Sequence, residues 1–272
     1  MAIVETVVTT KKAQITASVA FPDFTHEVVD PERGLIIQVG LNTINGPGGA
    51  EPHVTAITFD AVAMTEVASP GITQGNNLRG QTWVLVTPNL GTKTVSVTFS
   101  ALAGAETAEV TVVARSYSGA DQVGLIHGVN FAGSGDGTNA ITVGIVRPST
   151  NLIVDLCTAR EDHAQSPAGP DQTEIERQSQ GAGTAQVKVV ASFAAGKSPG
   201  SVVMSWGFGA GGPSDEWVTQ AVVVLPGEKR DIPTEVTTPP SAGVIGLFNG
   251  VEASPAFLQA ETSRSRRVRF IA

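Results

Sequence analysis

Residues 94–101 read Thr-Val-Ser-Val-Thr-Phe-Ser-Ala, so that every second side chain is apolar while its neighbour carries a hydroxyl or is small. Successive side chains of a β-strand point to opposite faces of a sheet. The alternation therefore predicts a strand with one face in a core and the other in water. We expect Val95, Val97 and Phe99 to face inward.

Comparable segments recur along the whole chain and predict a series of short strands. They lie at residues 7–20, 34–41, 54–59, 63–67, 82–87, 109–117, 140–146, 152–157, 185–193, 202–208 and 217–225. No stretch before residue 226 has a sustained helical period with caps, so the crossovers that parallel sheets need are missing. The sequence therefore predicts an all-β fold, an antiparallel two-sheet sandwich.

Composition agrees with this fold class and excludes several others. Of the 272 residues, 41% are hydrophobic and only 15% are charged, against about 25% charged in an ordinary soluble domain. Intrinsic disorder is therefore excluded. The net charge of −8 disfavours attraction to phosphates, so we expect no direct nucleic-acid partner. No apolar run reaches the roughly 18 residues of a membrane span, and the first residues do not resemble a signal peptide. We expect no membrane contact and synthesis in the host cytoplasm.

The character of the chain changes at Pro226, where a Pro-rich stretch begins. The sequence predicts a β-sandwich domain at 1–227, including an N-terminal strand. It predicts a Pro-rich linker and a C-terminal extended arm at 228–272.

The arm holds two short apolar segments that are too small to form a core of their own. Each could add a strand to a sheet edge of a neighbouring subunit. Four arginines lie near its end, whereas residues 1–263 carry a net charge of −12, so these arginines could pair with carboxylates on a second copy. A loose basic tail is the alternative. The candidate partner-binding residues are Val244, Leu247, Phe248, Arg264, Arg266, Arg267, Arg269 and Phe270.

Several segments occur in the order of a known module. They are residues 54–67, 82–91, the strand at 95–100, the aromatic turn at 116–122 and the closing strand at 217–226. Together they resemble the jelly-roll or lectin-like β-sandwich modules of bacteriophage virion proteins and bacterial surface proteins. The resemblance covers about residues 34–226 and implies a jelly-roll-like topology. Its motifs are packing signatures, so they inform on fold more than on function.

Few residues are candidates for chemistry. A metal or acid–base site is best supported at Asp155, Glu161, Asp162 and His163, because a strand end and its following loop can converge. A solvated loop is the favoured alternative. The loop at 133–139 has one carboxylate, Asp136, which is too few for a tight calcium site. Gly207 to Gly212 has dinucleotide-loop spacing, but a strand follows where a helix is needed.

The remaining candidates point to packing. His26, His53, His127 and His163 have no ligand spacing, and no nucleophile motif occurs, so we expect no metal, no cofactor and no enzymatic activity. The aromatic residues Trp83, Tyr117, Trp206 and Trp217 could form a sugar-binding platform, although their strand context favours a core. The only cysteine, Cys157, lies in an apolar run, which predicts a buried thiol.

Three functions follow from these observations. The first is a non-enzymatic virion structural protein of a tailed bacteriophage, such as a capsid decoration, cement or turret-like subunit. Its partners would be further copies of itself and other subunits such as the major capsid protein. The second is a carbohydrate-binding or adhesive surface module, including a tail-fibre receptor-binding domain. The third, a glycan hydrolase, would require paired carboxylates across a groove.

Overall fold

The computed structural model describes residues 3–44, 52–67, 72–74, 78–102, 106–133, 140–145, 151–160, 165–169, 171–182, 186–195, 200–208 and 217–227. These residues form strands and turns without a helix, and the sheets are antiparallel. The predicted all-β class is confirmed for this part of the chain. Among the same residues there is no helix with the length and apolar character that crossing a bilayer takes.

The strands fall into two sets that follow each other in sequence. The first set, the first sandwich, comprises β1 (Val4–Thr16), β2 (Phe24–Val28), β3 (Arg33–Ile44), β4 (Val54–Phe59), β5 (Val62–Ala63), β6 (Thr65–Glu66), β7 (Ile72–Gln74), β8 (Leu78–Val86), β9 (Gly91–Phe99) and β10 (Thr107–Ser118). The second set, the second sandwich, comprises β11 (Ile126–Gly133), β12 (Ala140–Ile145), β13 (Leu152–Arg160), β14 (Gln165–Pro167), β15 (Thr173–Gln180), β16 (Val187–Ala195), β17 (Gly200–Phe208) and β18 (Trp217–Val224).

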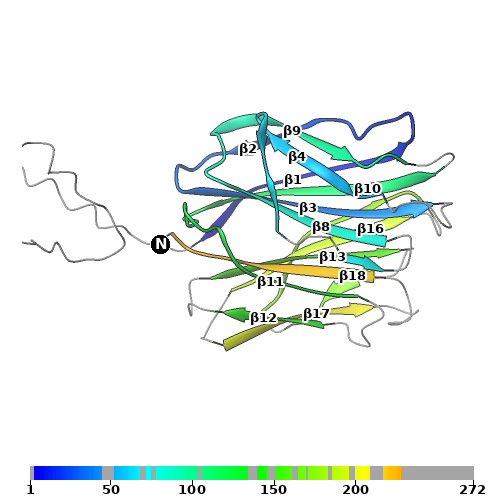
Figure 1. Cartoon of the computed structure of the whole chain (residues 1–272). Helices are drawn as coiled ribbons and strands as arrows, with labels where there is room; N and C mark the ends of the chain where they lie inside the picture. Colours follow the sequence, from blue (N-terminus) through cyan, green and yellow to red (C-terminus); the bar gives the residue numbers. More distant parts are fainter. Residues whose placement is uncertain are drawn as a thin grey trace, which may run out of the picture. The chain divides into compact units, whose positions relative to one another are not determined.

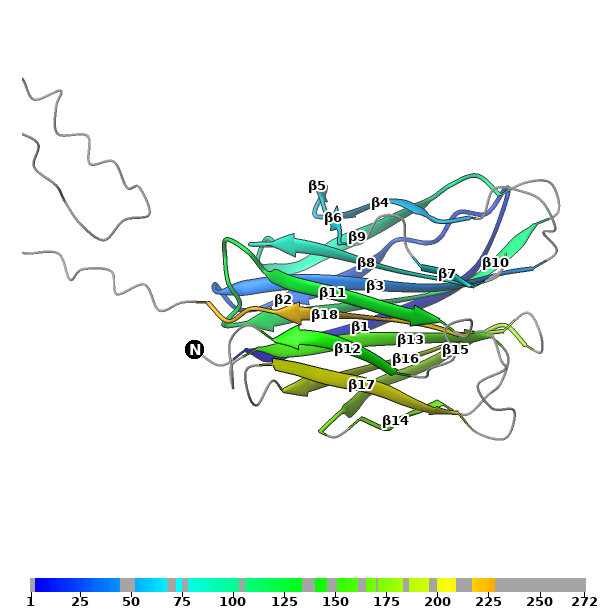
Figure 2. The same cartoon turned by 60° about the horizontal axis from the view of Figure 1, so that its bottom comes forward.

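Four sheets are stacked in layers, which corrects the expectation of two (Figure 1). An outer sheet β2-β9-β4-β5 covers an inner sheet β1-β10-β3-β8-β6, with β7 also paired to β8. The second inner sheet, β11-β18-β13-β16-β15, packs against the first inner sheet, and β12-β17-β14 covers its other face. Figure 2 shows the same order of layers from a second direction.

The central strands of the two inner sheets are buried on both faces, and this explains their sequence. All eight residues of β18 are buried, as are the first eight residues of β13. A strand covered on both sides has no wet face, so it is apolar along its length instead of alternating. The outer strand β9 keeps the alternation, with Val95 and Val97 buried and Thr94 and Thr98 exposed.

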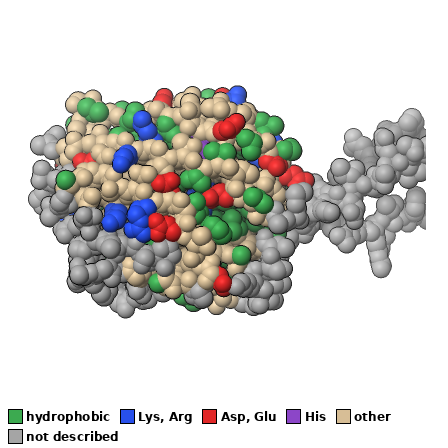
Figure 3. Space-filling model, turned by 180° about the vertical axis from the view of Figure 1, so that it is seen from behind, with side chains coloured by type: hydrophobic (Ala, Val, Ile, Leu, Met, Phe, Trp, Pro, Cys, Tyr) green, Lys and Arg blue, Asp and Glu red, His purple; other side chains and the backbone are tan. Residues whose placement is uncertain are grey.

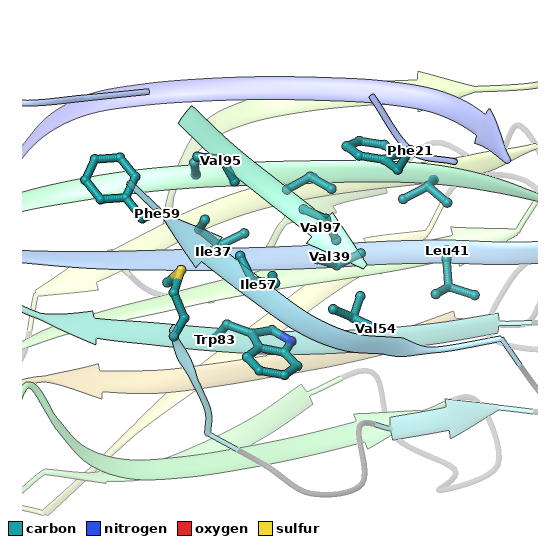
Figure 4. Close-up of a cluster of buried hydrophobic side chains, with 14 of the residues drawn as sticks. Phe21, Ile37, Val39, Leu41, Val54, Ile57, Phe59, Trp83, Val95 and Val97 are labelled. Carbon is teal, nitrogen blue, oxygen red and sulfur yellow. The ribbon is translucent and has the colours of Figure 1, made fainter. Parts of the chain in front are cut away.

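The first sandwich has an apolar core between its two sheets (Figure 4). Phe59 and Ile57 of β4 and Ile37 of β3 are almost fully buried there. The predicted inward orientation of Val95 and Val97 is confirmed. Phe99 also packs against this core but is only half-buried, because it lies at the end of β9.

The two sandwiches share one strand order. The inner sheet reads β1-β10-β3-β8 in the first sandwich and β11-β18-β13-β16 in the second. The outer sheet reads β2-β9-β4 in the first and β12-β17-β14 in the second. β1, β10, β3 and β8 therefore correspond to β11, β18, β13 and β16, and β2, β9 and β4 correspond to β12, β17 and β14. The sandwiches differ at one edge, where β15 joins the inner sheet through β16 and β5 joins the outer sheet through β4.

The contacts between the two inner sheets are reciprocal. β3 contacts β13; β10 contacts β16, and its counterpart β18 contacts β8. At the edges, where β7 pairs with β8 and β15 pairs with β16, β1 contacts β15 and β11 contacts β7. Such reciprocity is the property of an isologous dimer interface, in which each partner uses the same surface. Here both partners belong to one chain. Gly40 of β3 lies at a close approach of the two sheets, where a Cβ would stand 2.5 Å from Val189 Cγ1 and 2.7 Å from Thr158 Oγ1.

The chain divides into two compact units, Met1–Lys229 and Arg230–Ala272. Both sandwiches belong to the first unit. The predicted linker and arm at 228–272, with all eight candidate partner-binding residues, lie outside the described residues. They stay a prediction from sequence.

Candidate functional site

One polar cluster lies inside the second sandwich, and Asp155 is at its centre. Asp155 belongs to β13 and is fully buried, on the face that β17 covers. Ser192 Oγ of β16 donates a short hydrogen bond to Asp155 Oδ1. Trp206 Nε1 of β17 donates to Asp155 Oδ2 over 3.1 Å. The carboxyl group thus joins three strands and both sheets of this sandwich.

Gln172, just before β15, completes the cluster with both ends of its amide. Its Nε2 lies 3.3 Å from Asp155 Oδ2 and 2.9 Å from Ser192 Oγ. Its Oε1 accepts from the backbone N–H of Gly169 over 3.1 Å and from that of Ser205 over 3.0 Å. Because a backbone N–H can only donate, these two bonds fix which end of the amide is oxygen.

Burial controls the protonation of this cluster. Loss of solvation raises the pKa of Asp155 to about 7, against the opposing effects of the hydrogen bond from Ser192 and of the nearby Arg115 charge. Ionisation is costly in a dry interior unless donors compensate. The carboxyl group therefore changes charge near neutral pH.

Arg115 connects the cluster to the first sandwich. This β10 residue is buried, and its Nη1 lies 3.3 Å from the backbone oxygen of Ser192. Its Nε forms an ion pair of 2.6 Å with Glu5 Oε2, which also accepts from Tyr117 over 3.3 Å. Burial raises the pKa of Tyr117 well above its ordinary value, so this hydroxyl stays a donor. A chain of polar contacts therefore runs from β1 to β17.

Of the predicted metal or acid–base group, only Asp155 lies among the described residues, and its hydrogen-bond partners are residues outside that group. Asp155 was singled out by sequence, but Glu161, Asp162 and His163 lie outside the described residues, as does Asp136. The sequence does not indicate Ser192 or Gln172, and it indicates Trp206 only as an aromatic candidate, because all three approach Asp155 through strand pairing and sheet stacking. Among the described residues, no three His, Cys, Asp or Glu side chains are grouped as metal ligands would be.

The other candidates behave as packing residues. Trp83, Tyr117, Trp206 and Trp217 are buried, so the sugar-platform interpretation of these four is wrong. Cys157 is buried as predicted, and loss of solvation raises the pKa of its thiol. Gly207 and Phe208 end strand β17, and residues 209–212 of the glycine motif lie outside the described residues.

His26 is a buried group of the first sandwich. Its Nδ1 lies 2.9 Å from Thr9 Oγ1, and its ring meets the ring of Phe59 edge-on at 6.4 Å between centroids. Desolvation lowers the pKa of His26 to about 4. The imidazole is therefore neutral across the physiological range.

A groove of about 320 Å³ is present on the surface of the described residues. It lies at one end of the first sandwich, between residues 15–21 and 97–102. Its lining contains hydroxyls and apolar groups but no ionisable side chain. On the face shown in Figure 3, hydrophobic side chains form small groups among uncharged polar and charged ones. The groove can accept an apolar group but supplies no acid, base or charge.

No family model, curated protein or solved structure matches this chain.

Proposed function

We propose that each sandwich is a jelly roll and that the chain is a non-enzymatic structural protein of a tailed-phage virion. The observation that carries the proposal is strand order. In a jelly roll, strands 1-8-3-6 form one sheet and strands 2-7-4-5 form the other. With β1, β2, β3, β4, β5, β8, β9 and β10 as strands 1 to 8, all six of these pairings occur in the first sandwich.

The second sandwich supports the same topology. Five of the six pairings occur among β11 to β18, and the difference is that β15 pairs with β16 instead of β14. Jelly rolls are the architecture of many viral capsid proteins and of lectins. Fold alone does not choose between these two uses, so the choice depends on the side chains.

Side-chain burial favours the virion function over a carbohydrate-binding or adhesive module. A sugar site needs aromatic faces that are open to solvent, and the four aromatic candidates are inside the sandwiches. The buried polar cluster likewise holds layers together where a hydrolase would need carboxylates in a groove. We place the chain as a capsid decoration, cement or turret-like subunit, with itself and the major capsid protein as partners.

Mass spectrometry of virus particles tests this proposal directly. Particles are purified by density gradient from cultures of the strain that encodes the chain. We expect the chain in the particle fraction at a copy number comparable with that of other structural proteins. A chain found only in the non-particulate fraction of a lysate that contains particles would overturn the proposal.

Sedimentation of the pure chain tests the role assigned to the arm. The four arginines Arg264, Arg266, Arg267 and Arg269 are changed together to Gln, and the same measurement is made on a chain ending at Lys229. We expect the full chain to form an oligomer, the Gln variant a weaker one, and the shortened chain a folded monomer by circular dichroism. Full assembly of the shortened chain would show that the arm is dispensable.

A further inference from the structure

The outer sheet of the first sandwich has a vacant strand position beside β9. On one side of β9, β4 pairs with residues 95–99. On the other side, β2 pairs only with residues 91–95. Among the described strands, residues 97–99 therefore have a neighbour on one side alone. The open side of an edge strand presents backbone N–H and C=O groups that an added strand can bond.

The groove of the first sandwich lies at this vacant position. One wall is formed by residues 97–102, which end β9 and follow it, and the other by residues 15–21, which lead from β1 toward β2. Phe21 and Leu102 give it a buried apolar lining, and the rings of Phe21 and Phe99 lie 5.9 Å apart between centroids. An extended segment in this groove would continue the line of β2 and gain both backbone hydrogen bonds and apolar contacts.

The lining of the groove favours an uncharged occupant. It contains no ionisable side chain, so a charge buried there would stay uncompensated. Within the predicted arm, residues 236–251 form a stretch without a charged residue, between Glu235 and Glu252. This stretch contains the apolar segment Val-Ile-Gly-Leu-Phe at residues 244–248, which has no proline, so every residue can bond as a strand does. The second apolar segment of the arm contains Arg269, so the first one matches the groove better.

The point after which the arm begins and the groove lie at opposite ends of the first sandwich. The arm follows Gly227, whose N–H donates over 2.8 Å to the backbone oxygen of Gly119, the residue directly after β10. The groove is lined by Thr16, which pairs with Thr107, the first residue of β10. The 12 residues of β10 therefore separate the two places by about 37 Å.

This separation favours the groove of a second copy over the groove of the same chain. Val244 follows Gly227 by 17 residues. A flexible chain of that length spans about 23 Å on average, and it spans at most about 61 Å when fully extended. To reach its own groove, the linker would have to stretch beyond its average span and run back along the whole sandwich. A copy placed end to end presents its groove where the arm begins, so the linker needs no stretching.

We propose that residues 244–248 of one copy add a strand to β9 of the next copy, inside this groove, and so join the copies head to tail. The contact pairs the backbone of residues 97–99 and covers the apolar lining of the groove. It is heterologous, since it uses two different surfaces, and therefore closes into a ring or continues as a filament. The inference rests on the proposed function, in which copies of the chain are partners, and it names the surfaces that they use.

Two variants of the full chain, one for each side of the contact, test the proposal by sedimentation velocity. Val19→Glu places a charge on the exposed rim of the groove, and Leu247→Glu places one in the arm segment. Val62→Glu is the matched control, because Val62 is an exposed apolar residue of the same sandwich that does not line the groove. We expect oligomers for the wild type and for Val62→Glu, and monomers for each of the other two variants alone.

An equimolar mixture of Val19→Glu and Leu247→Glu completes the test. The first variant keeps an intact arm segment and the second an intact groove, so the mixture should form a dimer that grows no further. That dimer also shows that both variants are folded. A monomeric wild-type chain, or a mixture without dimers, would overturn the proposal. Oligomers of Val19→Glu like those of the wild type would place the arm on another surface and overturn it as well. The particle experiment is independent of these results, so the proposed function can stand where this contact fails.

Discussion

The two sandwiches share most of their strand pairings, and at one interior position with matching pairing they carry different kinds of side chain. Ile37 pairs with Ala114 of β10 and Trp83 of β8, and Asp155 pairs with Ala221 of β18 and Ser192 of β16. Both side chains point into the space between the inner and outer sheets. The first sandwich fills this space with apolar groups, and the second with a hydrogen-bonded carboxyl group. Similar strand pairings therefore accommodate either an apolar interior or one built around a hydrogen-bonded carboxyl group.

Moving the carboxyl group into the first sandwich should have the largest effect. Ile37→Asp places a carboxylate in an apolar core without the three donors that Asp155 has. A buried charge without partners costs several kcal/mol, so we expect a loss of at least about 4 kcal/mol in the free energy of unfolding. Urea unfolding followed by tryptophan fluorescence measures it.

The matched control is Ile37→Val, which removes one methylene and should cost about 0.5–1.5 kcal/mol. Equal stability of Ile37→Asp and Ile37→Val would show that the first core can satisfy a carboxyl group. The contrast between the two interiors would then be lost.

The second prediction concerns pH, because the two sandwiches bury groups with opposite responses. With its pKa raised to about 7, Asp155 holds its proton in the folded chain between about pH 4 and 7, where the unfolded chain has lost it. The folded state then binds more protons, so this group lowers the free energy of unfolding as pH rises through that window. The scale is on the order of 1.4 kcal/mol per pKa unit.

His26 acts in the other direction. Its pKa is lowered to about 4, so between about pH 4 and 6.5 the unfolded chain binds the extra proton. This group raises the free energy of unfolding as pH rises. The two slopes oppose each other in the wild-type chain. We expect Asp155→Asn to reveal the rising slope and His26→Gln the falling one, in urea titrations from pH 4 to 8. Parallel profiles for the two variants would contradict these assignments.

The third prediction separates the sandwiches instead of altering either interior. Gly40→Ala adds a Cβ that meets Val189 and Thr158 of the opposite inner sheet well inside van der Waals distance. Overpacking of this kind costs about 1–3 kcal/mol. We expect a lower melting temperature by calorimetry. Gly124→Ala is the control, since its added Cβ meets nothing within 4 Å. A Gly40→Ala melting temperature equal to that of Gly124→Ala would show that the interface yields without cost.

The smallest effect is expected at the turn between β4 and β5 of the first sandwich. Asp60 and Ala61 connect β4 to β5 with φ values of 52° and 62°, in the left-handed region that favours glycine. Ala61→Gly should therefore stabilise the chain by about 1 kcal/mol. Ala63→Gly, in the adjoining strand, should destabilise it by about 0.5–1 kcal/mol. A destabilised Ala61→Gly variant in chemical unfolding would contradict this account.

A comparison of β4 with β15 shows what local sequence can and cannot predict. Residues 54–59 were placed correctly as β4 because their alternation follows directly from one buried face. β15, with the sequence Thr-Glu-Ile-Glu-Arg-Gln-Ser-Gln, was missed because an edge strand that is largely open to water has no apolar alternation. β2 and β11 were missed as well.

The number of sheets is indicated by a different feature of the sequence, namely continuous apolar runs without alternation. Continuous apolar runs, such as those at 34–37 and 221–225, indicate burial on both faces, and hence more layers than two. Asp155 stood out as a lone acid in such a run. Its partners Gln172, Ser192 and Trp206 follow 17, 37 and 51 residues later. Only sheet pairing and stacking bring them together, so composition and spacing could not predict the cluster.

The reciprocal contacts between the inner sheets have a consequence for mass action. Two separate subunits joined through this surface would dissociate on dilution, because their association depends on concentration. In this chain the two partners are linked through residues 119–125, so each meets the other at an effective concentration that dilution cannot change. The stability of this interface should therefore be independent of protein concentration. An assembly built from such chains would keep its pairs intact even where its other contacts come apart.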